Sequence, residues 1–194
     1  VAEDDPWALA PAALSPTADR HLLPLVRAAD AILLAGYDVV EMRSPWRQPW
    51  DLARTRVIEV APVASDHDVH AATVELVGDV RATLLALGPE AGRSRWQPDE
   101  VGAVRTALRL ALGADRPWGP AALVDEARRV LPPTTIATAD AGAHRIVLSQ
   151  VWSCPAPRTL LQSNGHCTMG AAVPLAMGAK LAEPDRPVVA FVGD

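Results

Sequence analysis

Four short apolar stretches whose residues do not alternate with polar ones limit the fold of this chain more than any other feature of its sequence. A strand with this pattern is buried on both faces, as happens when helices cover both sides of a parallel sheet. Each stretch ends at a turn-forming residue or at a carboxylate, where such a strand stops. We therefore predict buried parallel strands at residues 31–35, 57–61, 135–139 and 188–192.

The residues between these strands repeat their apolar side chains at helical spacing. Val77, Val80 and Leu84 belong to one such series, and Gly88-Pro89 ends it. Helices that alternate with buried strands indicate the α/β class, with parallel sheets flanked by helices. We predict helices at about 19–29, 70–87, 99–112, 120–131 and 169–181.

The alternation is interrupted at residues 89–117, which hold Gly92-Arg93-Ser94-Arg95 and Arg116-Pro117. We interpret this stretch as a linker with one bridging helix. It separates residues 1–88 from residues 118–194, and each of these parts has the pattern of a partial Rossmann-like unit.

Composition and charge exclude several classes of protein. The net charge of −5 and the lack of a basic run argue against a nucleic-acid partner. No segment approaches the ~18 apolar residues that span a bilayer, so no membrane partner is expected. The acidic start, Val1-Ala2-Glu3-Asp4-Asp5, is unlike a secretory signal. Cys154 and Cys167 fit neither a redox pair nor a zinc knuckle, and two reduced cysteines are typical of a cytoplasmic protein.

Three segments place polar or small residues where a ligand could bind. Ligands of open parallel sheets bind beyond the carboxyl ends of strands, and residues 138–144 and Gly193-Asp194 are such ends. An aspartate there suits Mg²⁺, which takes few carboxylates together with phosphate oxygens, although Gly-Asp is also an ordinary turn. The small-residue loop 163–174 leads into the last helix, whose start favours anions. It equally fits a tight loop that feeds a buried helix.

Together these segments resemble the cofactor domain of thiamine-diphosphate-dependent enzymes, especially of the acetolactate synthase and benzoylformate decarboxylase type. The match keeps order and spacing over about sixty residues, from Pro133 onward. Its motifs are Asp140-Ala141-Gly142-Ala143-His144, Thr168-Met169-Gly170, Pro174-Leu175-Ala176-Met177-Gly178-Ala179-Lys180-Leu181-Ala182 and Gly193-Asp194. The resemblance implies that residues 118–194 are the first half of the cofactor domain.

The upstream residues resemble the second half of the same family's central domain, so residues 1–88 are expected to be its C-terminal part. The strand ending at Gly36 and the Gly78-Asp79 pair before the last helix of this part belong to the match. Some relatives hold FAD or ADP in that domain. Ala61 stands where many of them have an aspartate, so FAD is the less favoured cofactor here.

For the cofactor domain, the resemblance implies thiamine diphosphate and Mg²⁺ as cofactors. Asp194, after Gly193, corresponds to the aspartate that binds Mg²⁺ together with the cofactor diphosphate. His144 and the backbone at Ala143 correspond to positions that contact the diphosphate. Ala143 replaces a common glutamine.

The loop before the last helix contributes two further positions to the match. Met169 corresponds to the apolar residue that holds the cofactor in its bent shape, and the plain alternative is that it fills the core. The carbonyl of Cys167 corresponds to the acceptor for the amino group of the aminopyrimidine ring. Cys167 stands where the family usually has glycine.

The resemblance implies an enzyme that decarboxylates a 2-oxo acid and then releases or ligates the product, as a homodimer or homotetramer. The family's catalytic glutamate lies in an N-terminal domain that these residues do not match, so the 194 residues alone are expected to be inactive. Two alternatives remain. One is a nucleotide-binding Rossmann-like module, which the lack of a Gly-x-Gly-x-x-Gly motif disfavours. The other is a non-catalytic scaffold of the same fold.

Two further motifs have plain interpretations. His67-Asp68-Val69-His70 could hold a metal, but two histidines near a helix start are usually solvated. Trp46-Arg47-Gln48-Pro49-Trp50 could stack on a ligand, but it more readily anchors a loop or a subunit contact.

Overall fold

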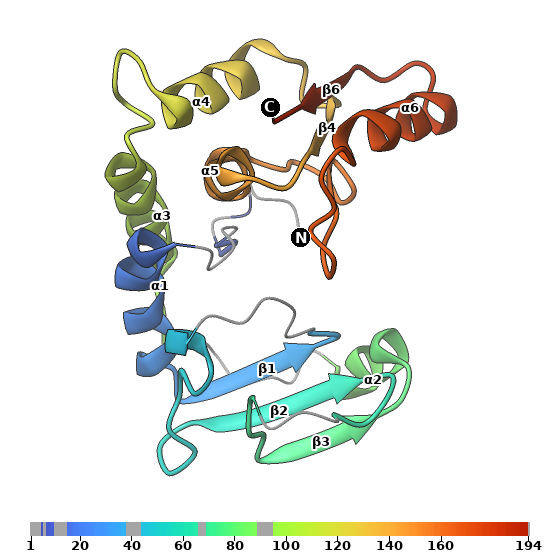
Figure 1. Cartoon of the computed structure of the whole chain (residues 1–194). Coiled ribbons are helices and arrows are strands. Elements are labelled where there is room, and N and C mark those ends of the chain that lie inside the picture. Colours follow the sequence, from blue (N-terminus) through green and yellow to red (C-terminus); the bar gives the residue numbers. More distant parts are fainter. Residues whose placement is uncertain are drawn as a thin grey trace. The chain divides into compact units, whose positions relative to one another are not determined.

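The computed structural model describes residues 5, 7–9, 15–37, 44–65, 69–88 and 95–193, and Figure 1 labels its helices and strands. The chain divides into two compact units, Leu22–Arg95 and the combination of Val1–His21 with Trp96–Asp194. Each unit contains a three-stranded parallel sheet and helices. The α/β class with two partial Rossmann-like units is therefore confirmed.

The sheet of unit Leu22–Arg95 has the strand order β1-β2-β3, with all strands parallel. Its strands are β1 (Ala31–Ala35), β2 (Arg56–Ala61) and β3 (Val74–Val77). The central strand β2 has fully buried side chains at Val57 and Val60. The two strands predicted in this region occur within one residue of their expected limits.

The helix predicted at 70–87 is wrong in its first half. Residues 74–77 form the edge strand β3, and only α2 (Val80–Leu87) is helical. Val74 and Val77 are exposed on that edge, and their spacing of three imitates a helix. Asp79 begins α2 by accepting a hydrogen bond at Oδ1 from Ala82 N at 2.6 Å, which satisfies one of the N–H groups left free at a helix start.

The larger unit has a sheet of order β5-β4-β6, again parallel. The strands predicted at 135–139 and 188–192 correspond to β4 and β6. Helix α5 and the three-residue strand β5 were not expected from the sequence. Helix α1 (Pro16–Ala28) contains the division between the two units. The remaining elements are α3 (Pro98–Leu112), α4 (Pro120–Val130), β4 (Ile136–Ala139), α5 (Ala143–Val151), β5 (Leu160–Gln162), α6 (Ala172–Ala182) and β6 (Val188–Phe191).

The core of this unit lies between β4 and the helices α4 and α5. Leu148 of α5 is fully buried against the small residues of β4, which leave room for it. Burying a side chain of this size stabilises a fold by about 1.5–3 kcal/mol. The ring of Trp152 meets Phe191 of β6 edge-on at 5.4 Å, and the Arg128 guanidinium lies 4.6 Å from its centroid. Burial lowers the pKa of Arg128.

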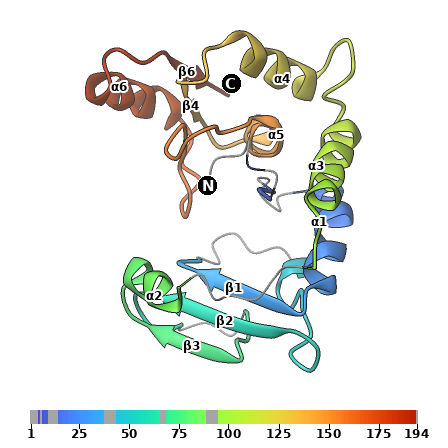
Figure 2. The same ribbon diagram turned by 180° about the vertical axis from the view of Figure 1, so that it is seen from behind.

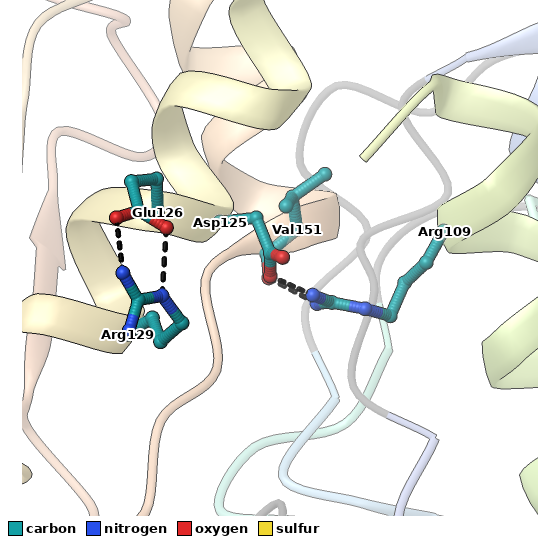
Figure 3. A network of polar contacts seen from close by, with 5 residues as sticks. All are labelled: Arg109, Asp125, Glu126, Arg129 and Val151. Atoms are coloured by element: carbon teal, nitrogen blue, oxygen red, sulfur yellow. Dashed lines mark hydrogen bonds and ion pairs between the residues drawn. The ribbon is translucent and has the colours of Figure 1, made fainter. Parts of the chain in front are cut away.

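Arg109 ties three helices of this unit together (Figure 3). From α3, its Nη1 donates to the carbonyl of Val151, the last residue of α5, at 2.7 Å. Its Nη2 forms an ion pair with Asp125 of α4. The Arg109 side chain thus caps a carbonyl at the C-terminus of α5 and connects α5 to α3 and α4.

The tryptophan-rich segment anchors a loop in the first unit. Trp50 is buried, and its Nε1 donates to the carbonyl of Ala71 at 3.1 Å. His70 is 7% exposed, contacts the carbonyl of Trp46 through Nε2 at 2.6 Å, and lies between the rings of Tyr37 and Trp50. The expectation of a solvated histidine pair is therefore wrong for His70, whose ring packs inside the loop. The other histidine of the pair, at position 67, lies outside the described residues.

Within the described ranges, none of the helices has both the length and the apolar character that a membrane crossing requires. Cys154 and Cys167 both lie in the described part of the chain, and neither forms a disulfide.

Candidate functional site

The carboxyl ends of the neighbouring parallel strands β4 and β6 lie at the same edge of the sheet of the larger unit. From β4 the chain passes through α5 to β5 on one side, whereas β6 pairs with β4 on the other side. In Figures 1 and 2, α5 and α6 lie to opposite sides of β4. Ligands of open α/β sheets bind beyond the carboxyl ends of their strands. The predicted site residues described by the structure all lie near this edge or in the loop before α6.

His144 joins the two strand ends. A methyl group on Gly193, after β6, would lie 3.2 Å from Cε1 of His144, and one on Gly142, after β4, would lie 2.9 Å from Nδ1. The imidazole therefore fits against backbone that has no room for side chains. Its Nε2 is buried and has no hydrogen-bond partner among the described residues. A buried ring nitrogen without a partner is costly, so Nε2 is a candidate contact for a bound ligand.

The start of α5 offers backbone donors at the same place. Gly142 is the N-cap, and no side chain caps the helix. The N–H of Arg145 donates to the Gly142 carbonyl at 3.1 Å, and the N–H groups of Ala143 and His144 precede that bond. They stand at the positive end of the helix dipole, where an anion is stabilised. Backbone donors in this arrangement suit an anion.

Helix α6 does not offer an anion site of the kind that the sequence led us to expect. Asp140 is 4% exposed, and its Oδ1 accepts a hydrogen bond from Ala172 N, at the first turn of α6, at 2.6 Å. Thr138 of β4 donates through Oγ1 to the carbonyl of Ala172 at 2.7 Å. The carboxylate of Asp140 already stands at this helix start, so Asp140 and Thr138 fix α6 to β4. The helix begins at Ala172, three residues later than predicted.

Cys167 has left-handed backbone, with φ of 46°. Glycine adopts this conformation without the steric cost that a side chain brings, which explains why glycine is usual at this position of the family. Arg145 of α5 donates through Nη1 to Cys167 Sγ at 2.8 Å and through Nη2 to Asn164 Oδ1 at 2.8 Å.

Met169 stands at the other end of the same loop. Its side chain is 84% exposed, so the interpretation of Met169 as core filling is wrong. The exposed side chain lies next to the candidate site, so it is available for contact with a ligand.

The predicted metal ligand follows Gly193 in the sequence. Gly193 lies beside His144, but Asp194 lies outside the described residues, so its role as a Mg²⁺ ligand stays a prediction. In the described ranges, no group of three histidine, cysteine, aspartate or glutamate side chains could hold a metal ion.

Sequence reasoning missed Arg145 and the structural use of Asp140. Arg145 directly follows the His144 of the matched motif, and its 7% exposure is the unexpected part, because arginine is rarely buried without partners. The replacement of the usual glycine by Cys167 was a signal for this contact, because a side chain in a tight loop needs a partner, here Arg145.

The model of the family "Thiamine pyrophosphate enzyme, C-terminal TPP binding domain" matches residues 140–194. An acetolactate synthase of Bacillus subtilis (strain 168) is 28% identical over 180 residues, which cover 88% of this chain and 31% of that protein. A catabolic acetolactate synthase of Raoultella terrigena is 30% identical over 189 residues, covering 88% of this chain and 32% of that protein. A protein of Pseudomonas aeruginosa named "Probable 2-ketoarginine decarboxylase" is 28% identical over 175 residues, with 88% and 31% covered.

These matches define the class of protein, the thiamine-pyrophosphate enzymes, whose C-terminal domain model matches residues 140–194 of this chain. The chain belongs to the thiamine-pyrophosphate-dependent enzyme family and is similar to acetolactate synthases over most of its length. It spans about a third of the length of the curated relatives that it matches.

Proposed function

We propose that this chain supplies the diphosphate-binding part of a site for thiamine diphosphate and Mg²⁺. The enzyme would decarboxylate a 2-oxo acid and then release or ligate the resulting acyl carbanion, and the similarity to acetolactate synthases and to a probable 2-ketoarginine decarboxylase supports this. The observation that favours this most is the buried Nε2 of His144, which has no partner among the described residues and lies beside Gly193 at the carboxyl ends of β4 and β6.

The residues present fit a diphosphate. An anion with several acceptor oxygens would satisfy His144 Nε2 and the N–H groups of Ala143 and His144 together. Gly142 and Gly193 leave the space that the His144 imidazole occupies, which keeps the ring against the two strand ends. Asp194 would provide the carboxylate for Mg²⁺, which is held by few protein oxygens plus phosphate.

The loop before α6 would hold the organic part of the cofactor. The Cys167 carbonyl would accept from the aminopyrimidine amino group, and the exposed Met169 side chain would support the bent shape. When bound, thiamine diphosphate supplies the electron sink that makes loss of CO₂ from a 2-oxo acid feasible. The protein's own part is to bind, orient and exclude water.

The same proposal extends to the whole enzyme. Residues 1–88 would be the C-terminal part of the central domain, 89–117 a linker with a bridging helix, and 118–194 the N-terminal part of the cofactor domain. The enzyme would be a cytoplasmic homodimer or homotetramer with a small 2-oxo acid as substrate, and FAD is not favoured. The 194 residues alone would not turn over, because none of them matches the family's catalytic glutamate.

The test is release of CO₂ from pyruvate and from bulkier 2-oxo acids by the complete gene product, with thiamine diphosphate and Mg²⁺ added. We expect release that needs both additions. A folded protein that binds both but decarboxylates none of a panel of 2-oxo acids would contradict the assigned reaction.

A second candidate is a non-catalytic scaffold of the same fold. It is favoured by Cys167, which keeps a strained left-handed backbone where glycine is usual, and by Ala143 in place of glutamine. The two candidates differ in cofactor binding, because a scaffold has no reason to bind thiamine diphosphate saturably.

A further inference from the structure

A buried arginine connects α5 to the loop that precedes α6. Arg145 is 7% exposed, and its two terminal nitrogens reach different residues of that loop. Nη1 donates to Cys167 Sγ at 2.8 Å, and Nη2 donates to Asn164 Oδ1 at 2.8 Å. The planar guanidinium is suited to such a two-point contact, because its donors have a fixed relative geometry.

The loop before α6, residues 163–171, has a strained backbone that a contact with α5 can hold in place. Its backbone has positive φ at Gly165 (82°), Cys167 (46°) and Gly170 (73°). The two glycines adopt this conformation freely, whereas the cysteine adopts it at an energetic cost. Inside the loop, the N–H of Thr168 donates to Ser163 Oγ at 3.2 Å and the N–H of His166 donates to the Asn164 carbonyl at 2.9 Å. These contacts close the turn but do not connect it to the rest of the unit.

We propose that Arg145 is the positioning residue that fixes this loop relative to the diphosphate site. It directly follows His144, so the backbone that holds the diphosphate contacts also holds the guanidinium. Through Asn164 and Cys167, the guanidinium sets where the Cys167 carbonyl and Met169 stand. This inference rests on the proposed function, since it assigns a partner to the cofactor-facing loop.

Removal of the guanidinium has a defined consequence. Without it the loop populates other conformations, and the apparent dissociation constant rises in inverse proportion to the fraction of molecules with the competent loop. Arg145 does not contact the reacting atoms, so saturation with cofactor returns the loop to its working position. Arg145→Met is therefore expected to raise the Kd for thiamine diphosphate by about tenfold or more and to leave kcat at saturating cofactor within about threefold.

The experiment uses the complete gene product and four forms: wild type, Arg145→Met, Arg145→Lys and Arg129→Met. The last is a matched control, because Arg129 is an exposed arginine that pairs with Glu126 on its own helix. Kd is measured by titration calorimetry with thiamine diphosphate and Mg²⁺. The second readout is the rate of alkylation of Cys167 relative to Cys154 at one alkaline pH, measured on peptides by mass spectrometry without cofactor.

The expected result is a weakened Kd and a raised Cys167-to-Cys154 alkylation ratio in Arg145→Met. Arg145→Lys should lie in between, because an ammonium group reaches one partner, and Arg129→Met should equal wild type. A variant that only lost folded protein would lower total activity and leave the Kd of the remaining molecules unchanged, which would overturn the positioning role. Wild-type Kd and alkylation ratio in Arg145→Met would overturn it as well. Absence of binding by wild type would instead overturn the proposed function, together with this inference.

Discussion

At the scale of single residues, the site depends on one imidazole and the glycines beside it. His144 is held between Gly142 and Gly193, so its Nε2 has a fixed direction before any ligand arrives. A donor fixed in advance loses little entropy on binding, and a buried donor left without a partner is costly. The free site is thus prepared for an anion.

His144→Ala should weaken binding of thiamine diphosphate by about 10- to 100-fold, because it removes a hydrogen bond to a charged group worth about 1.5–3 kcal/mol. Titration calorimetry measures the change. The control is His21→Ala on α1, outside the site, for which we expect no change in affinity. Equal affinities of wild type and His144→Ala would show that His144 does not contact the cofactor.

Gly142→Ala tests the space around the imidazole. Gly142 has φ of 148°, and its new methyl group would lie 2.9 Å from the His144 ring. Both the backbone strain and the displaced ring cost energy, so we expect a loss of about 1–3 kcal/mol in the free energy of unfolding, together with weaker cofactor binding. Urea unfolding measures the first. Gly178→Ala is the control, because a methyl group there meets nothing within 4 Å.

At the scale of elements, α6 is attached to β4 by the side chain of Asp140. Asp140→Ala leaves the buried N–H of Ala172 without its acceptor, and we expect a loss of about 1–3 kcal/mol in the free energy of unfolding. Asp140→Asn keeps the shape but not the charge at the helix start, so its loss should be smaller. An Asn variant less stable than the Ala variant would contradict this account.

The contact among α3, α4 and α5 is the second device at this scale. Arg109→Met should lower the free energy of unfolding by about 1–2 kcal/mol, mainly because the carbonyl of Val151 loses its donor. Asp125→Asn should cost less, since water screens this partly exposed ion pair. Thermal or urea unfolding of the two variants ranks the contributions, and a larger loss in Asp125→Asn would show that the ion pair dominates.

The neighbouring pair in Figure 3 shows how pH acts on an exposed contact. The hydrogen bond from Arg129 holds the pKa of Glu126 below its ordinary value of 4.5. A lowered carboxyl pKa stabilises the fold above the unfolded-state value, and this contribution is lost as pH falls through the lowered pKa. Both side chains are exposed, so salt should remove the effect.

The sequence predicted β1, β2, β4 and β6, each within one residue of its limits, whether the strand lies at the centre or at the edge of its sheet. β2 and β4 lie at the centres of their sheets, and their sequences are mostly apolar, with Glu59 and Thr138 as buried polar exceptions. β3 is an edge strand with exposed valines, and its three-residue spacing imitates a helix. Helix α5 directly follows the polar end of β4, and β5 has only three residues, which is too short to show a period. Tertiary contacts decide whether those elements form, and local sequence patterns do not reveal such contacts.

The candidate site was partly predictable for a related reason. Motif spacing placed Ala143, His144 and Gly193 at strand ends, and strand ends of a parallel sheet meet at one edge. The contact of Arg145 with Asn164 and Cys167 joins residues 19 and 22 positions apart, and nothing in local spacing indicates it. Likewise, Asp140 follows its strand as a metal-binding aspartate would. The two differ only in the partner of the carboxylate, which for Asp140 is the N–H of Ala172.

At the scale of the whole molecule, the chain has two α/β units and matches about a third of the length of acetolactate synthases, and its proposed diphosphate-binding edge is formed by the carboxyl ends of β4 and β6. The central claim is that this edge binds thiamine diphosphate with Mg²⁺. The most direct measurement is titration calorimetry of the complete gene product with thiamine diphosphate, in the presence of Mg²⁺ and again after its removal by a chelator. We predict saturable binding of one cofactor per chain that weakens strongly without Mg²⁺. No saturable binding by folded protein with Mg²⁺ present would contradict the account and leave a scaffold with the fold of the family.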